Sequence, residues 1–121
     1  MDANQTTEQA LVIDYADAMD RFGDNEALYK RLAGKFTTDT HFAELEEALA
    51  CNDLDAAYRA AHSLKGVAGN LSFAQLYQLA SIVSKALETG DRATADEYIG
   101  QVKDAYLAVL DALVDLEAAS N

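Results

Sequence analysis

One stretch of the chain, residues 57–71, spaces its apolar side chains as an α-helix does and leaves little room for another fold. Successive helical residues are about 100° apart, so positions i, i+3, i+4 and i+7 share one side. Proline is absent and glycine is scarce, so strand and turn signals are few. We therefore expect an all-α protein. The apolar positions of this stretch are Ala57, Ala60, Ala61, Leu64, Val67, Ala68 and Leu71.

Similar spacing in the rest of the chain predicts six helices joined by short links. A Thr-x-x-Gln capping box at residues 6–9 predicts the start of the first helix. Short links between helices of similar length favour antiparallel neighbours. We expect an antiparallel up-down four-helix bundle, with additional N-terminal helices packed against one end, in a single domain of residues 1–121. The expected links are Gly23-Asp24 (a C-cap and an N-cap), Thr37–Thr40, Asn52-Asp53, Leu71–Phe73 and Thr89–Asp91.

The first three helices have apolar sides that we expect to face the core, and the acids of the third helix are expected to face solvent. The expected inward residues are Leu11, Val12, Tyr15, Ala16 and Met19 in the first helix, Leu28, Leu32 and Phe36 in the second, and Phe42, Leu45, Ala48 and Leu49 in the third.

Composition limits the classes of function. A net charge of −12 argues against nucleic acid as a partner, because phosphates need a basic surface. The single cysteine, Cys51, favours a reducing compartment, and its surroundings predict a small buried group instead of a reactive thiol. No signal peptide or membrane-length apolar run is present, so no membrane association is expected. We expect a cytoplasmic monomer that meets protein partners.

Several kinds of catalytic or metal site are disfavoured by spacing. His41-x-x-Glu44 has the reverse order of the Glu-x-x-His motif of a di-iron bundle, and no second motif accompanies it. Asp14, Asp17 and Asp20 follow helical spacing, whereas a calcium loop needs alternate acids and a glycine turn. No cofactor or metal is expected, and His41 is expected to be a solvated helix residue.

His62 is the most informative side chain, because on a helical wheel it points nearly opposite the apolar side of its helix. Gly66 and Gly69 lie one and two turns further along its own face. Glycine inside a helix costs about 1 kcal/mol, so two of them beside an exposed histidine need a reason. The flanking side chains are Tyr58 and Lys65 on one side and Arg59 on the other.

These residue types suit transfer of a phosphoryl group. Neutral imidazole is a good nucleophile near pH 7, and the Lys65 ammonium would pair with an arriving phosphoryl oxygen. The bare backbone at the glycines would let the surface of another protein approach His62. The spacing alone leaves open the alternative that His62 is merely exposed and the glycines incidental.

Residues 62–71, His-Ser-Leu-Lys-Gly-Val-Ala-Gly-Asn-Leu, closely resemble the signature of histidine-containing phosphotransfer (HPt) domains. That motif is His-x-Leu-Lys-Gly, followed by small residues and a Leu-Gly-type helix end. The similarity extends from about Ile13 through Gly90-Asp91. Two positions depart from it: Ser72 stands where the family usually has glycine, and Ser84 where a glutamate is common. The second departure is expected to alter the docking surface.

The resemblance implies a helical phosphoryl carrier that is not a self-sufficient enzyme. It implies that His62 accepts a phosphoryl group from a receiver-domain aspartate, or from a histidine kinase, and passes it to the receiver of a response regulator. Lys65 would give electrostatic support, and Tyr58, Arg59, Gly66 and Gly69 would dock receivers of response regulators and hybrid histidine kinases. The partner receiver would supply the aspartate and the bound Mg²⁺.

Two other functions remain open at this point. The chain is also compatible with the N-terminal phosphotransfer module of a chemotaxis-type histidine kinase, in which an ATP-binding domain charges the histidine. A non-catalytic helical adaptor would use the same helix face only to bind a partner.

Overall fold

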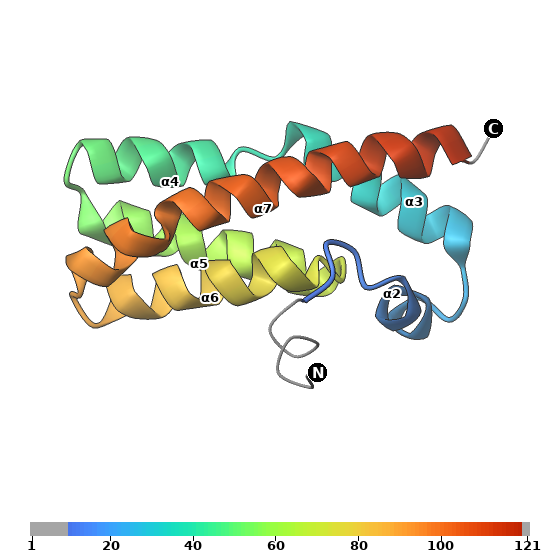
Figure 1. The fold of residues 1–121 in the computed structure, drawn as a ribbon, viewed down its shortest axis with the longest axis horizontal. Helices are drawn as coiled ribbons and strands as arrows, with labels where there is room; N and C mark the ends of the chain where they lie inside the picture. The colour runs from blue at the N-terminus through green and yellow to red at the C-terminus, as the bar shows by residue number, and fades with distance from the viewer. Residues whose placement is uncertain (1–9, 120–121) are drawn as a thin grey trace, which may run out of the picture.

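The computed structural model describes residues 10–119, and all of its regular elements are helices, as predicted. In Figure 1 the helices of residues 41–119 lie side by side, and those of residues 15–34 lie at one end. The capping box at residues 6–9 lies outside the described residues. The elements are α2 (Tyr15–Arg21), α3 (Glu26–Gly34), the 3₁₀ helix η1 (Lys35–Thr38), α4 (His41–Ala50), α5 (Leu54–Asn70), α6 (Ala74–Glu88) and α7 (Arg92–Ala119).

The first of these helices, α2, begins later than the sequence predicted. Asp14 is its N-cap and accepts a hydrogen bond from the backbone of Asp17. Residues 10–14 are not helical, because their backbone bonds the α5–α6 turn instead: Asp14 N donates to Ser72 O at 2.8 Å, and Gln75 N donates to Leu11 O at 2.9 Å. The prediction that Leu11 faces the core is wrong, since its side chain is 57% exposed.

α3 also differs in detail from the prediction. Asn25, and not Asp24, caps its N-terminus, because Asp24 adopts a left-handed backbone (φ 62°) and its side chain makes no cap bond. Leu28 and Leu32 are only half-buried, since the helix turns a neighbouring stripe toward the core. The buried positions of that stripe are Tyr29, Ala33 and, in η1, Phe36.

The up-down bundle of α4–α7 was predicted correctly. Successive helices pack as neighbours, α4 on α5, α5 on α6 and α6 on α7 (Figure 1). Asp53 caps α5 by accepting from Ala56 N, and Asp91 accepts from Thr94 N at the start of α7. The core runs the length of the bundle and includes Leu45, Leu64, Leu76, Val83, Val102 and Val109, all fully buried.

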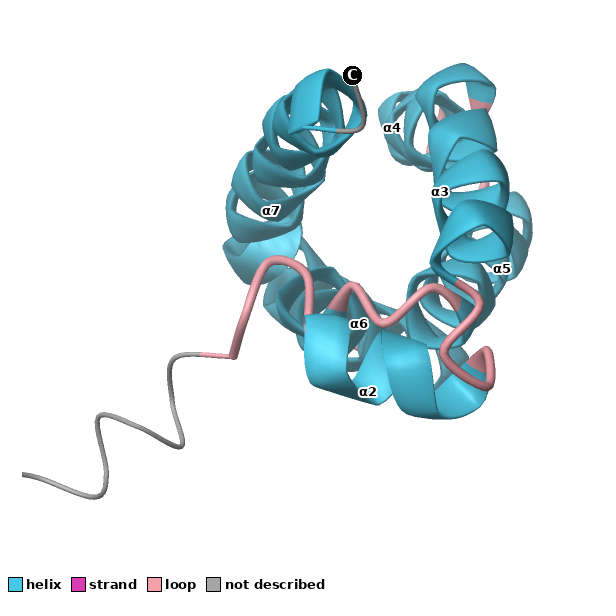
Figure 2. Cartoon of the chain, turned by 90° about the vertical axis from the view of Figure 1, so that its right-hand side faces the viewer, coloured by secondary structure: helices cyan, strands magenta, loops and turns pink. Residues whose placement is uncertain are grey.

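The two N-terminal helices close one end of the bundle (Figure 2). The buried hydroxyl of Tyr29 donates to Leu71 O at 2.6 Å, in the turn that ends α5. Burial raises the pKa of this phenol, so it stays a neutral donor at physiological pH. α2 and α3 are joined by a hydrogen bond from the Tyr15 hydroxyl to the Glu26 carboxylate, which raises the pKa of Tyr15 to about 12.

Ser72, in the same turn, is held by α2. Its backbone is left-handed (φ 61°) and its side chain is buried. The Ser72 hydroxyl donates to Asp17 Oδ2 at 2.7 Å, and Arg21 Nε donates to the same oxygen at 2.7 Å. The hydrogen bond from Arg21, followed by that from Ser72, holds the pKa of the Asp17 carboxyl below its usual value. The turn after α5 is therefore fixed by residues far earlier in the chain.

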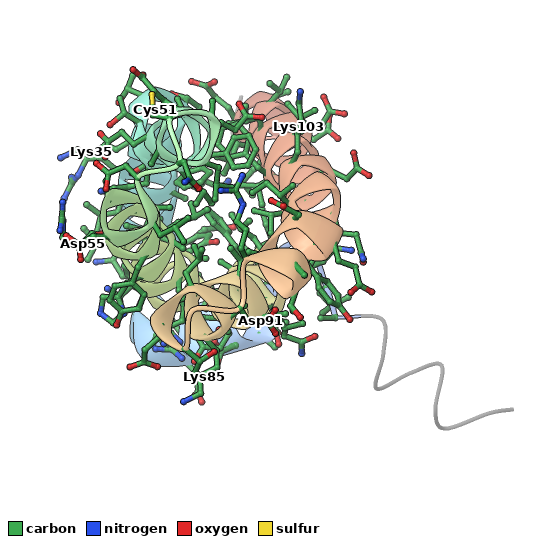
Figure 3. All side chains as sticks on the ribbon, turned by 90° about the vertical axis from the view of Figure 1, so that its left-hand side faces the viewer. Lys35, Cys51, Asp55, Lys85, Asp91 and Lys103 are labelled. Carbon is green, nitrogen blue, oxygen red and sulfur yellow. The ribbon has the colours of Figure 1, made fainter. Side chains whose placement is uncertain are left out.

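The prediction that Cys51 is buried is wrong. Cys51 is exposed at the C-cap of α4, on the outside of the bundle in Figure 3. A turn residue between two antiparallel helices has core on neither side, so an apolar character alone does not bury it. Among residues 10–119, no helix combines the length and the apolar content that crossing a bilayer requires.

Candidate functional site

His62 lies at the middle of α5, exposed on the side away from the core, where the helical wheel predicted it. Its neighbours Ala61 and Leu64 are fully buried, so the helix is anchored directly beneath it. Among residues 10–119, the imidazole has no hydrogen-bond or ion-pair partner. Its ring contacts that of Tyr58, one turn earlier, with centroids 5.8 Å apart and planes at 32°. The nitrogens of the imidazole are therefore available to a reactant from outside.

The two cations predicted beside His62 differ in their pairing. Arg59 is exposed and forms an ion pair with Asp55, whose carboxylate lies on the outer side of α5 (Figure 3). Lys65 is half-buried and has no such partner among the described residues. On a helix, residues three apart are neighbours, so Lys65 lies next to His62. Lys65 is thus the cation whose charge is left for a ligand.

The two glycines also differ. A side chain at Gly66 would meet nothing within 4 Å, which leaves open space beside His62. A Cβ at Gly69 would lie only 3.1 Å from Cδ1 and Cε1 of Tyr77, on α6. Sequence reasoning assigned both glycines to partner clearance. The packing gives Gly69 another role, because its missing side chain makes room for a ring of the same chain.

Beyond Gly69, the surface forms an open pocket of about 360 Å³ that sequence reasoning missed. α2 contributes Arg21 and α6 contributes Tyr77, whose side chain is 42% exposed. No pattern within the sequence reveals this contact, since it joins segments about fifty residues apart. The lining residues are Asp17, Arg21, Ala68, Gly69, Asn70, Ser72, Ala74 and Tyr77.

The difference between the two glycines should appear in the free energy of unfolding of their alanine variants. Gly66→Ala is expected to raise the free energy of unfolding by about 0.5–1 kcal/mol, the usual gain from replacing glycine inside a helix. Gly69→Ala is expected to gain less, because the Tyr77 ring must move to admit the methyl group. Urea unfolding of the two variants measures this, and equal gains would show that Tyr77 does not restrict position 69.

Of the remaining candidates, His41 lines an open pocket that it shares with Arg59 and Ser63 of α5. His41 was predicted to be a solvated helix residue. It is the first residue of α4, but it is half-buried and its Nδ1 lies 2.8 Å from Asp39 Oδ1. Ser84 is buried, so its departure from the family pattern does not change the exposed face of α6. Within residues 10–119, no three His, Cys, Asp or Glu side chains gather as metal ligands would.

Comparison with known proteins adds one finding. The family model described as "Hpt domain" matches residues 36–115, more than half of the chain. The match begins at Phe36 in η1 and continues through α4, α5 and α6 into α7, so it includes His62 and leaves out α2 and α3. Searches of curated proteins and of solved structures returned no match.

Proposed function

The chain belongs to the Hpt domain family, whose members are phosphotransfer carriers of two-component signalling that interact with receiver domains, and we propose that His62 is its phosphoryl acceptor. One observation carries the assignment. Of the two histidines in the chain, His62 alone stands exposed on a helix face beside an unpaired cation and an open glycine position. His41 is instead bonded to Asp39.

The transfer needs only a nucleophile from this chain. The lone pair of an imidazole nitrogen of His62 forms an N–P bond with the aspartyl phosphate of a receiver. The P–O bond to the aspartate breaks, and its electron pair leaves with the carboxylate. The proton on the other ring nitrogen stays in place during the step. The reverse step returns the phosphoryl group to an aspartate, so the same site serves a donor and an acceptor.

The proposal also includes the partner proteins, the cellular compartment and the source of the metal ion. The partners are receivers of response regulators and hybrid histidine kinases, and the receiver contributes the Mg²⁺ and the in-line geometry. The receiver docks over the face formed by Arg59, His62 and Gly66, with the half-buried Gly69 at its edge. We also propose a monomer in the cytoplasm, which the strongly acidic charge and the single exposed cysteine favour.

Lys65→Ala is expected to slow transfer to His62 by about 5- to 30-fold, because a charge-assisted contact to a phosphoryl oxygen contributes roughly 1–2 kcal/mol. The lifetime of the phosphohistidine is expected to shorten with it. Single-turnover transfer from a phosphorylated receiver measures the rate. The rates are compared at saturating receiver concentration, where the loss of a docking contact no longer limits transfer. There Arg59→Ala is the matched control and should change the rate much less, since Asp55 already pairs with Arg59. Equal losses in the two variants would contradict a specific role for Lys65.

The function itself is tested by incubating the full chain with a panel of receiver domains charged by acetyl phosphate. A carrier gains phosphate that is labile in acid and stable in base, as phosphohistidine is. A non-catalytic adaptor binds receivers without gaining phosphate. Binding without transfer across the panel would therefore refute the proposal and favour the adaptor.

A further inference from the structure

The surroundings of the His62 imidazole toward the N-terminus of α5 differ from those toward its C-terminus. One turn toward the N-terminus lies the ring of Tyr58, at 5.8 Å between centroids and 32° between planes. That separation is within the 4.5–7 Å range of favourable aromatic pairs. One turn toward the C-terminus lies Gly66, where an added Cβ would meet nothing within 4 Å beyond its own stretch of helix backbone. The ring is thus supported on one side and open on the other.

The direction of helical side chains explains the contact. Long and aromatic side chains on a helix point back toward its N-terminus, over the residue four positions earlier. His62 therefore leans toward Tyr58 and away from Gly66. No described residue forms a hydrogen bond with the imidazole, so its contact with the Tyr58 ring can restrict its rotation.

Tyr58 is itself held in place, as such a support must be. Its ring is half-buried and packs against the core. It also lines an open pocket of about 270 Å³, together with Leu54 of α5 and Leu87 and Glu88 of α6. Packing against the core holds the inner side of the ring, and the same ring contacts His62.

We propose that Tyr58 is a positioning residue for phosphoryl transfer. Its ring stops the imidazole from swinging toward the N-terminus of α5 and holds the reactive nitrogen toward the open side at Gly66, from which the phosphoryl donor arrives. The inference rests on the proposed function of His62. It replaces the docking role that the resemblance implied for Tyr58, because a positioning residue changes the rate within the complex and leaves the affinity for the receiver unchanged.

The experiment compares Tyr58→Phe, Tyr58→Leu and Tyr58→Ala in the full chain, with a receiver that phosphorylates the parent protein. Single-turnover rates are measured over a range of receiver concentrations, which separates the saturating rate from the half-saturating concentration. We expect Phe to keep the parent rate, because it retains the ring. Leu and Ala should lower the saturating rate about 3- to 10-fold, the range for one aromatic contact, with the half-saturating concentration unchanged.

A second readout needs no partner. The order parameter of the His62 Cδ2–H bond, from NMR relaxation of the free protein, should fall in the Leu and Ala variants and stay at the parent value in Phe. Circular dichroism checks the helical fold, and Tyr58→Leu supplies the test if Tyr58→Ala unfolds. A higher half-saturating concentration at an unchanged saturating rate would overturn the proposal in favour of docking. Parent behaviour in all variants would also overturn it, whereas a parent protein that takes no phosphate refutes the function of His62 itself.

Discussion

His62→Gln is expected to abolish phosphoryl acceptance completely. Glutamine has a similar reach and polarity, but its amide nitrogen has no lone pair available to attack phosphorus. Since His62 is exposed and has no hydrogen-bond partner among residues 10–119, the substitution should leave the helical fold and its stability unchanged. Labelled phosphate is followed from a charged receiver to the protein, and circular dichroism and urea unfolding verify the fold.

The other histidine provides the matched control. His41→Gln changes the same residue type in the same protein, at a position where the imidazole is already hydrogen-bonded to Asp39. It should accept phosphate at the parent rate. Labelled phosphate on His62→Gln, or its loss from His41→Gln, would show that the acceptor has been misassigned.

The largest effect on stability is expected for Tyr29→Ala. Tyr29 is fully buried, its ring packs edge-to-face on Phe22 at 5.2 Å, and its hydroxyl donates to Leu71 O. Removing a buried aromatic side chain of this kind typically costs about 3–5 kcal/mol. That is a large share of the stability of a domain of this size. Urea unfolding measures the loss from the midpoint and the slope of the transition.

Tyr29→Phe separates the hydroxyl from the ring. It keeps the packing and leaves the Leu71 carbonyl without its partner, so a loss of about 1–3 kcal/mol is expected. The same data test whether residues 1–121 form one cooperative domain. If the bundle of Tyr29→Ala unfolds at the parent urea concentration, α2 and α3 are a separate unit and the single-domain prediction fails.

The sequence predicted the bundle well because α4–α7 have continuous apolar stripes, and because α5 and α7 begin at capping aspartates. Asp53 follows Asn52 in the sequence, and Asp91 follows Gly90. Each aspartate was the predicted start of a helix, and each caps one. The same periodicity placed His62 on the outer face of α5. A helical wheel is sufficient for such statements, since burial of one face requires exposure of the other.

The errors fall where contacts between distant segments override local patterns. Residues 10–14 bond the α5–α6 turn, so α2 starts at Tyr15 although Leu11 and Val12 continue its apolar spacing. The predicted role of Gly69, clearance for a partner, came from its position on the face of its own helix. In the structure, the ring of Tyr77 on α6 packs against this position. Periodicity describes one helix at a time, so it does not reveal which side chain of a neighbour fills a gap.

At Ser72, two effects on stability oppose each other. A left-handed backbone costs a non-glycine residue roughly 1–2 kcal/mol, which a glycine would avoid. A glycine would also remove the hydroxyl that binds Asp17 and, through it, holds α2 on the bundle. The Tyr29 hydroxyl and the backbone bond from Asp14 to residue 72 would still hold this end of the bundle. Ser72→Gly is therefore expected to change the free energy of unfolding little, because its gain and its loss oppose each other.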